Sequence, residues 1–129
     1  MSASEQFILA IQTGDLLYVE KHLKRPGTEI NAEVRHGRNA LHYAADAGKL
    51  PIIRFLVQSM AAIIDYQDDD GMTPLMAAVD KDHLNAVDFL LKEGADPFIK
   101  DETDKTVFDI ARDKEFTKIQ KLLEDYKKK

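Results

Sequence analysis

The chain repeats itself about every thirty-four residues, and this period limits its fold more than any other feature of the sequence. The segment 37–57, GRNALHYAADAGKLPIIRFLV, returns over residues 71–91 as GMTPLMAAVDKDHLNAVDFLL. The same step backward places Gly14 on Gly48, and a further copy follows at a step of 33. A fixed period of this length is typical of repeat proteins, in which each unit packs mainly on its neighbours. We therefore predict four copies that fill nearly the whole chain.

Each copy predicts a turn, a short inner helix, a tight turn and a longer outer helix. In the third copy Thr73 precedes a proline, an order suited to a helix cap and first turn, so we predict an inner helix over about 74–81. The outer helix is predicted over about 84–93, with Gly94 directly after it. Asp82 stands where copies one and two have glycine, and we expect it to adopt the left-handed backbone conformation.

Small residues on the inner helices indicate that the two helices of a copy pack closely. The pairs Ala44-Ala45 and Ala77-Ala78 would allow antiparallel helices to approach each other. One such hairpin cannot bury both of its faces, so neighbouring hairpins must stack. The predicted fold is an all-α solenoid of four stacked helix–turn–helix repeats with degenerate terminal caps. It forms one domain over residues 1–129, with repeats at about 4–34, 35–67, 68–100 and 101–126 and a basic tail at 127–129.

Composition limits the cellular compartment in which we expect the protein to act. The 129 residues include no cysteine, which removes disulfides, cysteine-ligated zinc and thiol nucleophiles. The N-terminus lacks the basic and apolar regions of a signal peptide, and no apolar run approaches the roughly 20 residues needed to cross a bilayer. We expect a protein of the cytoplasm or nucleus. Because no heptad seam is present, a monomer is the default expectation.

Acidic side chains are concentrated in the third repeat. The net charge is −5, but residues 68–99 alone hold eight acidic and two basic side chains. Such a field repels phosphate backbones and favours a basic protein partner, so nucleic acid is not an expected ligand. We interpret the C-terminal YKKK as a solvated tail that complements a helix end, rather than as a membrane or nuclear-import signal.

Neither catalysis nor cofactor or metal binding is predicted. His22 and His36 have no second histidine at the ligand spacing of i, i+4. The DDDG segment at 68–71 is not followed by the spacing of a calcium loop. Catalysis by paired carboxylates needs a pocket in which they converge, and an open solenoid offers none. We therefore expect a non-enzyme with no cofactor.

The third copy resembles the ankyrin repeat. Residues 68–96 match the pattern D-x-x-G-x-T-P-L-x-x-A-A followed by H-L-x-x-V-x-x-L-L-x-x-G-A-D, and copy two keeps it with Asn39-Ala40 in place of Thr-Pro. The first and fourth copies are degenerate, as terminal caps should be because their outer faces meet water. The resemblance implies that His42 and His83 bond to backbone groups and help to join one repeat to the next.

Two features depart from the family pattern. Repeats one and two each carry one extra residue near the end of the outer helix, around KRPG and QSMAA, and Ala61 stands where a helix-ending glycine is usual. We expect the fold to accommodate these changes, while the curve of the stack could shift.

The resemblance implies a protein-binding module that uses its loop tips and concave face. The likeness to small four-repeat members of the family implies the heterodimeric actin capping protein as the first expected partner, which would be sequestered so that filament barbed ends stay free to grow. A general scaffold or adaptor in signalling or transcription, such as a kinase-inhibitor-like protein, remains the alternative.

Stacking predicts which side chains stay exposed on that face. Large apolar side chains concentrate interface energy, so Leu9, Tyr43, Tyr66 and Met72 are the expected anchors, although Tyr66 could equally pack against the neighbouring turn. Asp68 is expected to support its turn, while Asp69 and Asp70 could equally be solvated at its tip or contact a partner. The predicted partner-binding residues are Leu9, Thr13, Arg35, Arg38, Tyr43, Asp46, Tyr66, Asp69, Asp70, Met72 and Asp80.

Overall fold

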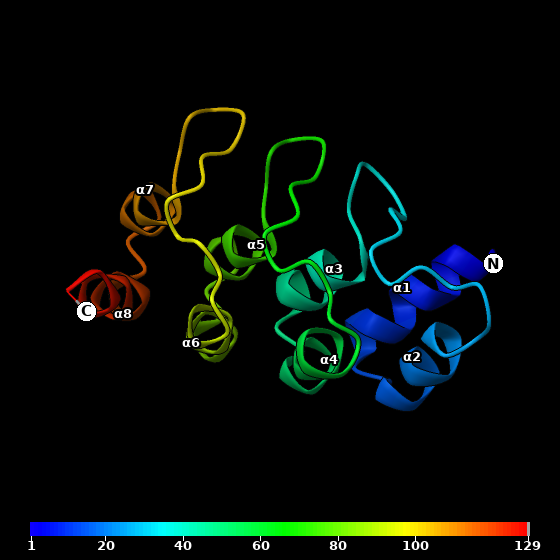
Figure 1. Cartoon of the computed structure of the whole chain (residues 1–129). Helices are drawn as coiled ribbons and strands as arrows, with labels where there is room; N and C mark the ends of the chain where they lie inside the picture. The colour runs from blue at the N-terminus through cyan, green and yellow to red at the C-terminus, as the bar shows by residue number, and fades with distance from the viewer. Residues whose placement is uncertain (129) are drawn as a thin grey trace.

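Pairs of helices stand side by side in a row, and the long loops between pairs all project to the same side (Figure 1). The structure is a computed structural model that describes residues 1–128. The helices nearest the loops are α1 (Ala3–Thr13), α3 (Ala40–Ala47), α5 (Pro74–Asp80) and α7 (Val107–Asp113). Their partners are α2 (Leu16–Leu23), α4 (Leu50–Arg54) with its continuation η1 (Phe55–Ser59), α6 (Leu84–Lys92) and α8 (Thr117–Lys127).

This arrangement confirms the predicted all-α stack. Over residues 1–128 the β-structure is limited to one isolated bridge, between Arg35 and Arg38. None of the helices in this range is long and apolar enough to cross a bilayer. Of the expected basic tail at 127–129, Lys127 belongs to α8 and Lys129 lies outside the described residues.

Polar caps begin the inner helices at matching repeat positions. The Asn39 side chain accepts a hydrogen bond from the backbone N–H of His42 at 3.3 Å, and the Thr73 hydroxyl accepts one from that of Met76 at 3.2 Å. Each bond satisfies a donor that a helix start would otherwise leave free. The prediction that Thr73 caps α5 is confirmed.

A left-handed residue reverses the chain after every inner helix. The positions are Gly14, Gly48, Asp82 and Glu115, with φ of 82°, 67°, 60° and 59°. The expectation for Asp82 is therefore correct. Left-handed backbone is unfavourable for residues with a Cβ, so the last two turns are held by the packing of the helices they join.

The alanine pairs lie where the helices approach. Ala44, Ala45, Ala77 and Ala78 are each at most 1% exposed. Leu56, Leu90 and Leu123 on the outer helices are equally buried, and all of these residues belong to one core cluster that runs through the four repeats. Each repeat therefore depends on its neighbours to remove its apolar side chains from water.

The extra residue of repeat two is absorbed by a single π-helical turn. The backbone N–H of Ala62 bonds to the carbonyl of Leu56, six residues back, whereas in repeat three Ala95 bonds to Leu90, five residues back. The difference of one residue falls in η1, where Met60 donates to Phe55. A π-bulge is the usual way for a helix to take in one residue. Leu56 is 0% exposed, so the core register is kept.

Replacing Ala61 with glycine is expected to stabilise the protein by up to about 1 kcal/mol. Ala61 ends the π turn with φ of 54°, where a Cβ costs about 1–2 kcal/mol, and the added freedom of glycine in the unfolded chain offsets part of the gain. Urea titration followed by circular dichroism measures the change. The control is Ala62→Gly, one residue later, which should destabilise the protein.

Two histidines join neighbouring repeats, as the family pattern implies. Nε2 of His42 donates to the carbonyl of Met72 at 2.9 Å, and Nδ1 accepts from the backbone N–H of Asn39 at 3.2 Å. Nε2 of His83 lies 2.9 Å from the carbonyl of Asp46. Burial lowers the pKa of His42 and outweighs the opposing effect of its bond to Met72, so the ring is held neutral.

Candidate functional site

The loop tips of repeats three and four are each built around one aspartate. Oδ1 of Asp68 accepts the backbone N–H groups of Asp70 and Met72, both at 2.9 Å. Asp101 does the same in repeat four, for Thr103 at 2.8 Å and Lys105 at 3.1 Å. Asp68 therefore supports its turn as expected.

Hydrogen bonds that Asp101 accepts within the tip also keep its carboxylate ionised. Partial burial acts to raise its pKa, but the bonds from the Thr103 hydroxyl and from the backbone of Lys105 and Thr103 together lower it. The carboxylate therefore stays ionised well into the acidic range, which keeps the tip folded.

Backbone hydrogen bonds connect successive tips. The N–H of Asp69 donates to the carbonyl of His36 at 3.0 Å, and that of Glu102 donates to Asp70 at 3.0 Å. The tips come this close because a glycine faces each junction: a Cβ on Gly71 would lie 2.9 Å from the backbone nitrogen of Glu102. The tips of repeats two to four are thus one pre-ordered row.

The predicted partner-binding residues differ widely in exposure. Tyr43 was expected to be an exposed anchor, and this is wrong. Its side chain is buried, with 9% of its surface accessible, and the Arg38 guanidinium lies 5.1 Å from its ring centroid. Of the others, Leu9, Thr13, Arg35, Asp69 and Asp70 are exposed, whereas Arg38, Asp46, Tyr66, Met72 and Asp80 are half-buried.

Ion pairs between repeats occupy the carboxylates at the ends of the inner helices. Oδ1 of Asp46 lies 3.3 Å from the ammonium of Lys81, and Oδ1 of Asp80 lies 2.6 Å from that of Lys114. Arg38 adds a second contact to Asp46, at 3.6 Å. Lys114 was not predicted as a partner of Asp80, although it follows Lys81 at the repeat spacing of 33 residues. The inner-helix part of the concave face is therefore largely neutralised.

The tip carboxylates remain without such partners. Within residues 1–128, the ion pairs do not include Asp69, Asp70 or Glu102. All three are exposed and belong to the connected tips of repeats three and four. We call these three residues the acidic tip row. It carries part of the negative charge of the third and fourth repeats at the exposed loop tips.

Tyr66 contacts the preceding repeat. Its hydroxyl donates a hydrogen bond to the Glu33 carboxylate, and its ring meets His42 edge-on at 6.2 Å between centroids. The bond to Glu33 raises the pKa of Tyr66. Tyr66 was expected either to anchor a partner or to pack against the neighbouring turn. These contacts correspond to packing against the neighbouring turn.

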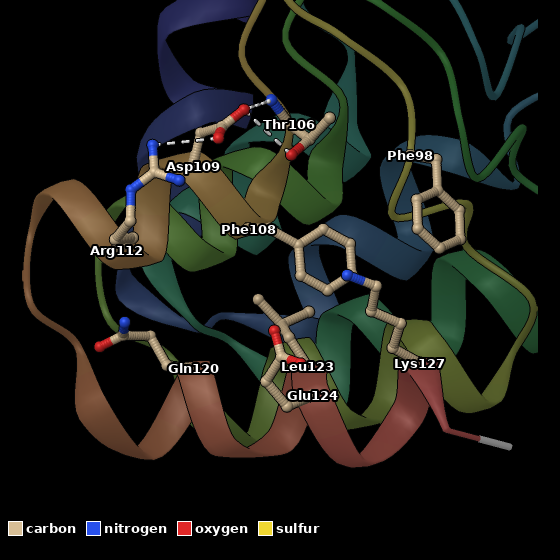
Figure 2. Close-up of a pocket in the computed structure, with 9 residues that line it drawn as sticks. All are labelled: Phe98, Thr106, Phe108, Asp109, Arg112, Gln120, Leu123, Glu124 and Lys127. Carbon is tan, nitrogen blue, oxygen red and sulfur yellow. Dashed lines mark hydrogen bonds and ion pairs between the residues drawn. The ribbon is translucent and has the colours of Figure 1, made fainter.

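A hollow of about 410 Å³ lies between α7 and α8 at the C-terminal end of the row (Figure 2). Phe98 stacks on Phe108 with 5.4 Å between ring centroids, and the Lys127 ammonium lies 5.2 Å from the Phe108 centroid. Asp109 pairs with Arg112 at 3.1 Å. Hydrogen bonding by the Thr106 backbone lowers the pKa of Asp109, so this acid is ionised and already bonded.

This end of the row has the polar character of a terminal cap. Asp109 and Arg112 occupy the positions that Met76 and Val79 hold in repeat three, where both are buried. Within residues 1–128, no three histidine, cysteine, aspartate or glutamate side chains gather where they could hold a metal ion. The acidic tip row is therefore the feature of this structure most suited to recognising another molecule.

Stacked helix pairs with projecting, hydrogen-bonded tips define a repeat protein with an open interaction surface. The family model for ankyrin repeats, in three copies, matches residues 7–101, and the chain belongs to the ankyrin-repeat family. The fourth helix pair, α7 and α8, lies beyond that match. It nevertheless stacks on the third through the Lys114–Asp80 ion pair and the bond from Glu102 to Asp70.

Similar proteins share the repeat but differ in other respects. The chain is 31% identical over 107 residues to tyrosine-protein kinase Shark of Drosophila melanogaster, covering 83% of this chain and 11% of that protein. It is 30% identical over 86 residues to 26S proteasome non-ATPase regulatory subunit 10 of Dictyostelium discoideum, covering 67% and 37%. It is 35% identical over 75 residues to protein fem-1 homolog A-like of Mus musculus, covering 58% and 11%. The chain thus spans well under half the length of these relatives.

Ankyrin repeats indicate a protein–protein interaction module, and that is the level at which the family defines this chain. The relatives' names describe proteins of different kinds, so the choice of partner must be argued from this chain's own surface.

Proposed function

We propose that this protein is a non-enzymatic binding module that covers a basic functional surface of a partner protein and keeps the partner idle. The acidic tip row carries the proposal. Its carboxylates have no cationic partner among the described ion pairs, so a basic surface can approach them without first breaking such a pair. Elsewhere on the concave face, Asp46 and Asp80 are already paired.

The order of the tips supports a rigid mode of binding. Backbone bonds within and between tips hold Asp69, Asp70 and Glu102 in place before a partner arrives. A pre-ordered surface loses less conformational freedom on association, so more of the contact energy appears as affinity. Met72, half-buried in the same tip as Asp69, adds apolar surface beside the charges.

The first partner to test is the heterodimeric actin capping protein. The chain resembles myotrophin in its four repeats, in the segment AIQTGDLLYVEKHL of the first repeat, and in LHYAADAGKL of the second. On this proposal, the protein acts in the cytoplasm or nucleus as a monomer. It sequesters capping protein and leaves filament barbed ends free to grow.

Reversing two charges of the acidic tip row tests the electrostatic part of the proposal. The double variant Asp69→Lys, Asp70→Lys is expected to slow association with purified capping protein about tenfold or more at low salt, because the steering field is lost. The wild-type rate should fall as salt rises towards physiological strength, where charges are screened over about 8 Å. Stopped-flow association kinetics measure both effects.

The matched control changes two exposed acids on α8. Glu124→Lys with Asp125→Lys alters the net charge equally but lies on α8, on the side of the row away from the projecting loops (Figure 1). Its association rate should change much less. Equal slowing in both variants would show that net charge alone is responsible, and no binding of capping protein at all would favour the alternative of a general adaptor.

A further inference from the structure

His22 occupies a position that every other repeat fills with leucine. Steps of 34, 34 and 33 residues lead from His22 to Leu56, Leu90 and Leu123. Each of these leucines is at most 1% exposed and belongs to the common core. The first repeat thus places a titratable ring where its neighbours place an aliphatic side chain.

The His22 ring is packed against apolar groups and lacks a polar partner. It stacks on Phe7 of α1 with 4.2 Å between ring centroids, and the Tyr18 ring lies 6.3 Å away. Its Nδ1 atom is buried and has no hydrogen-bond partner among the described residues. A pocket of about 190 Å³ adjoins the ring and reaches Ala40 at the start of α3. Packing between the first and second repeats is therefore incomplete at this residue.

The charged groups around the ring do not stabilise a proton on it. Burial lowers the pKa of His22, and the positive charge of Arg25, just after α2, lowers it further. From the loop after α2, Glu29 and Glu33 line the pocket, but Glu33 is engaged by Tyr66. The pocket residues from α1 and α3 are uncharged. Among residues 1–128, the ion pairs do not include His22.

Among the described repeats, the first repeat packs on the second alone. In a linear array, a unit that is held on one side can open while the rest stays folded. His42, whose pKa burial also lowers, joins repeats two and three in the interior of the row.

We propose that His22 makes the first repeat an acid-sensitive element, in which protonation releases α1 and α2 from the second repeat while repeats three and four stay folded. An exposed histidine titrates near pH 6.5, and His22 in the closed repeat binds the proton less readily. The open form therefore binds more protons, and the opening equilibrium rises as the pH falls through about 6.5.

Opening would remove Leu9 and Thr13 from the concave face, since both lie on α1. Acidification would then weaken partner binding at the N-terminal end. This consequence depends on the proposed function, whereas the opening itself is a property of the isolated chain and is tested without a partner.

Amide hydrogen exchange at pH 7.5 and 5.5, corrected for the intrinsic exchange rate, tests the proposal. In the wild-type chain, the opening constant for amides of α1 and α2 should rise by up to about tenfold between these pH values, the limit set by a histidine with a pKa near 6.5 in the open form. Amides of α6 exchange when the interior repeats open, where His42 also contributes, so their pH response should not depend on His22 alone. No change in α1 and α2 would overturn the proposal.

Two variants make the test specific to the residue. His22→Leu restores the side chain of the other repeats and should abolish the pH-dependent rise, while His36→Gln, a change in an exposed loop residue, should retain it. Persistence of the rise in His22→Leu would refute the role of His22. A measurement on the unmodified chain is independent of variant folding: the imidazole chemical shifts of His22 should titrate below pH 6.5, and titration above that value would also refute it.

Discussion

Replacing Gly48 with alanine is expected to destabilise the protein by about 3 kcal/mol. Gly48 has φ of 67°, where a Cβ costs about 1–2 kcal/mol. The added Cβ would also lie 2.5 Å from Nδ1 of His83 in the next repeat. Displacing that ring would weaken its hydrogen bond to the carbonyl of Asp46, worth about 1 kcal/mol. Gly48, which separates the two helices of repeat two, thus also lies against repeat three.

The control for this prediction is the same change one repeat earlier. Gly14 has φ of 82°, but a Cβ there would meet only the flexible Lys49 side chain, at 3.6 Å. Gly14→Ala should therefore cost about 1–2 kcal/mol, the backbone part alone. Urea unfolding followed by circular dichroism gives both values. If the two variants lose equal stability, the close approach of His83 has no energetic weight.

Replacing His42 with alanine is expected to cost about 3 kcal/mol. The side chain is 0% exposed and bonds to the carbonyl of Met72 and the backbone N–H of Asn39. Its removal leaves a cavity and two buried polar groups without this partner, each of which costs about 1–3 kcal/mol when unsatisfied. His36→Ala, which changes an exposed side chain, should stay within about 0.5 kcal/mol of the wild type.

The pH dependence of unfolding provides a second measurement on the same variant. Because burial lowers the pKa of His42 in the fold, the unfolded chain binds this proton more readily. The stabilisation is complete above about pH 6.5 and is lost as the pH falls from there towards the folded-state pKa. His42→Ala should flatten the stability profile between pH 7.5 and 5.5, leaving the slope that belongs to His22. A profile as steep as that of the wild type would contradict this account.

Local features of the fold were predictable because short-range chemistry determines them. The cap at Thr73, the left-handed Asp82 and the buried alanine pairs each follow from the residues beside them. The bonds of His42 and His83 were anticipated from the family pattern, because they recur at fixed places in it. The four-fold period then made stacking the way to bury the apolar faces.

The burial and the ion pairing of the surface residues were less predictable. Tyr43 is covered by Arg38, which reaches back from the preceding loop, and its burial could not be read from its place on α3. Asp46 and Asp80 looked like free acids, but cations of the following repeats neutralise them. Whether two such side chains meet depends on the angle and distance between successive helix pairs, which the repeat pattern does not specify.

By itself, the sequence determined that this chain forms stacked helix pairs and where each pair turns, because periodicity, caps and left-handed positions act over a few residues. Only the tertiary structure decided that η1 would absorb the extra residue of repeat two. It also decided that, within residues 1–128, cations pair with Asp46 and Asp80 but not with Asp69, Asp70 and Glu102 at the tips. The physical reason is that these outcomes depend on distances across the repeat junctions, and packing sets those distances.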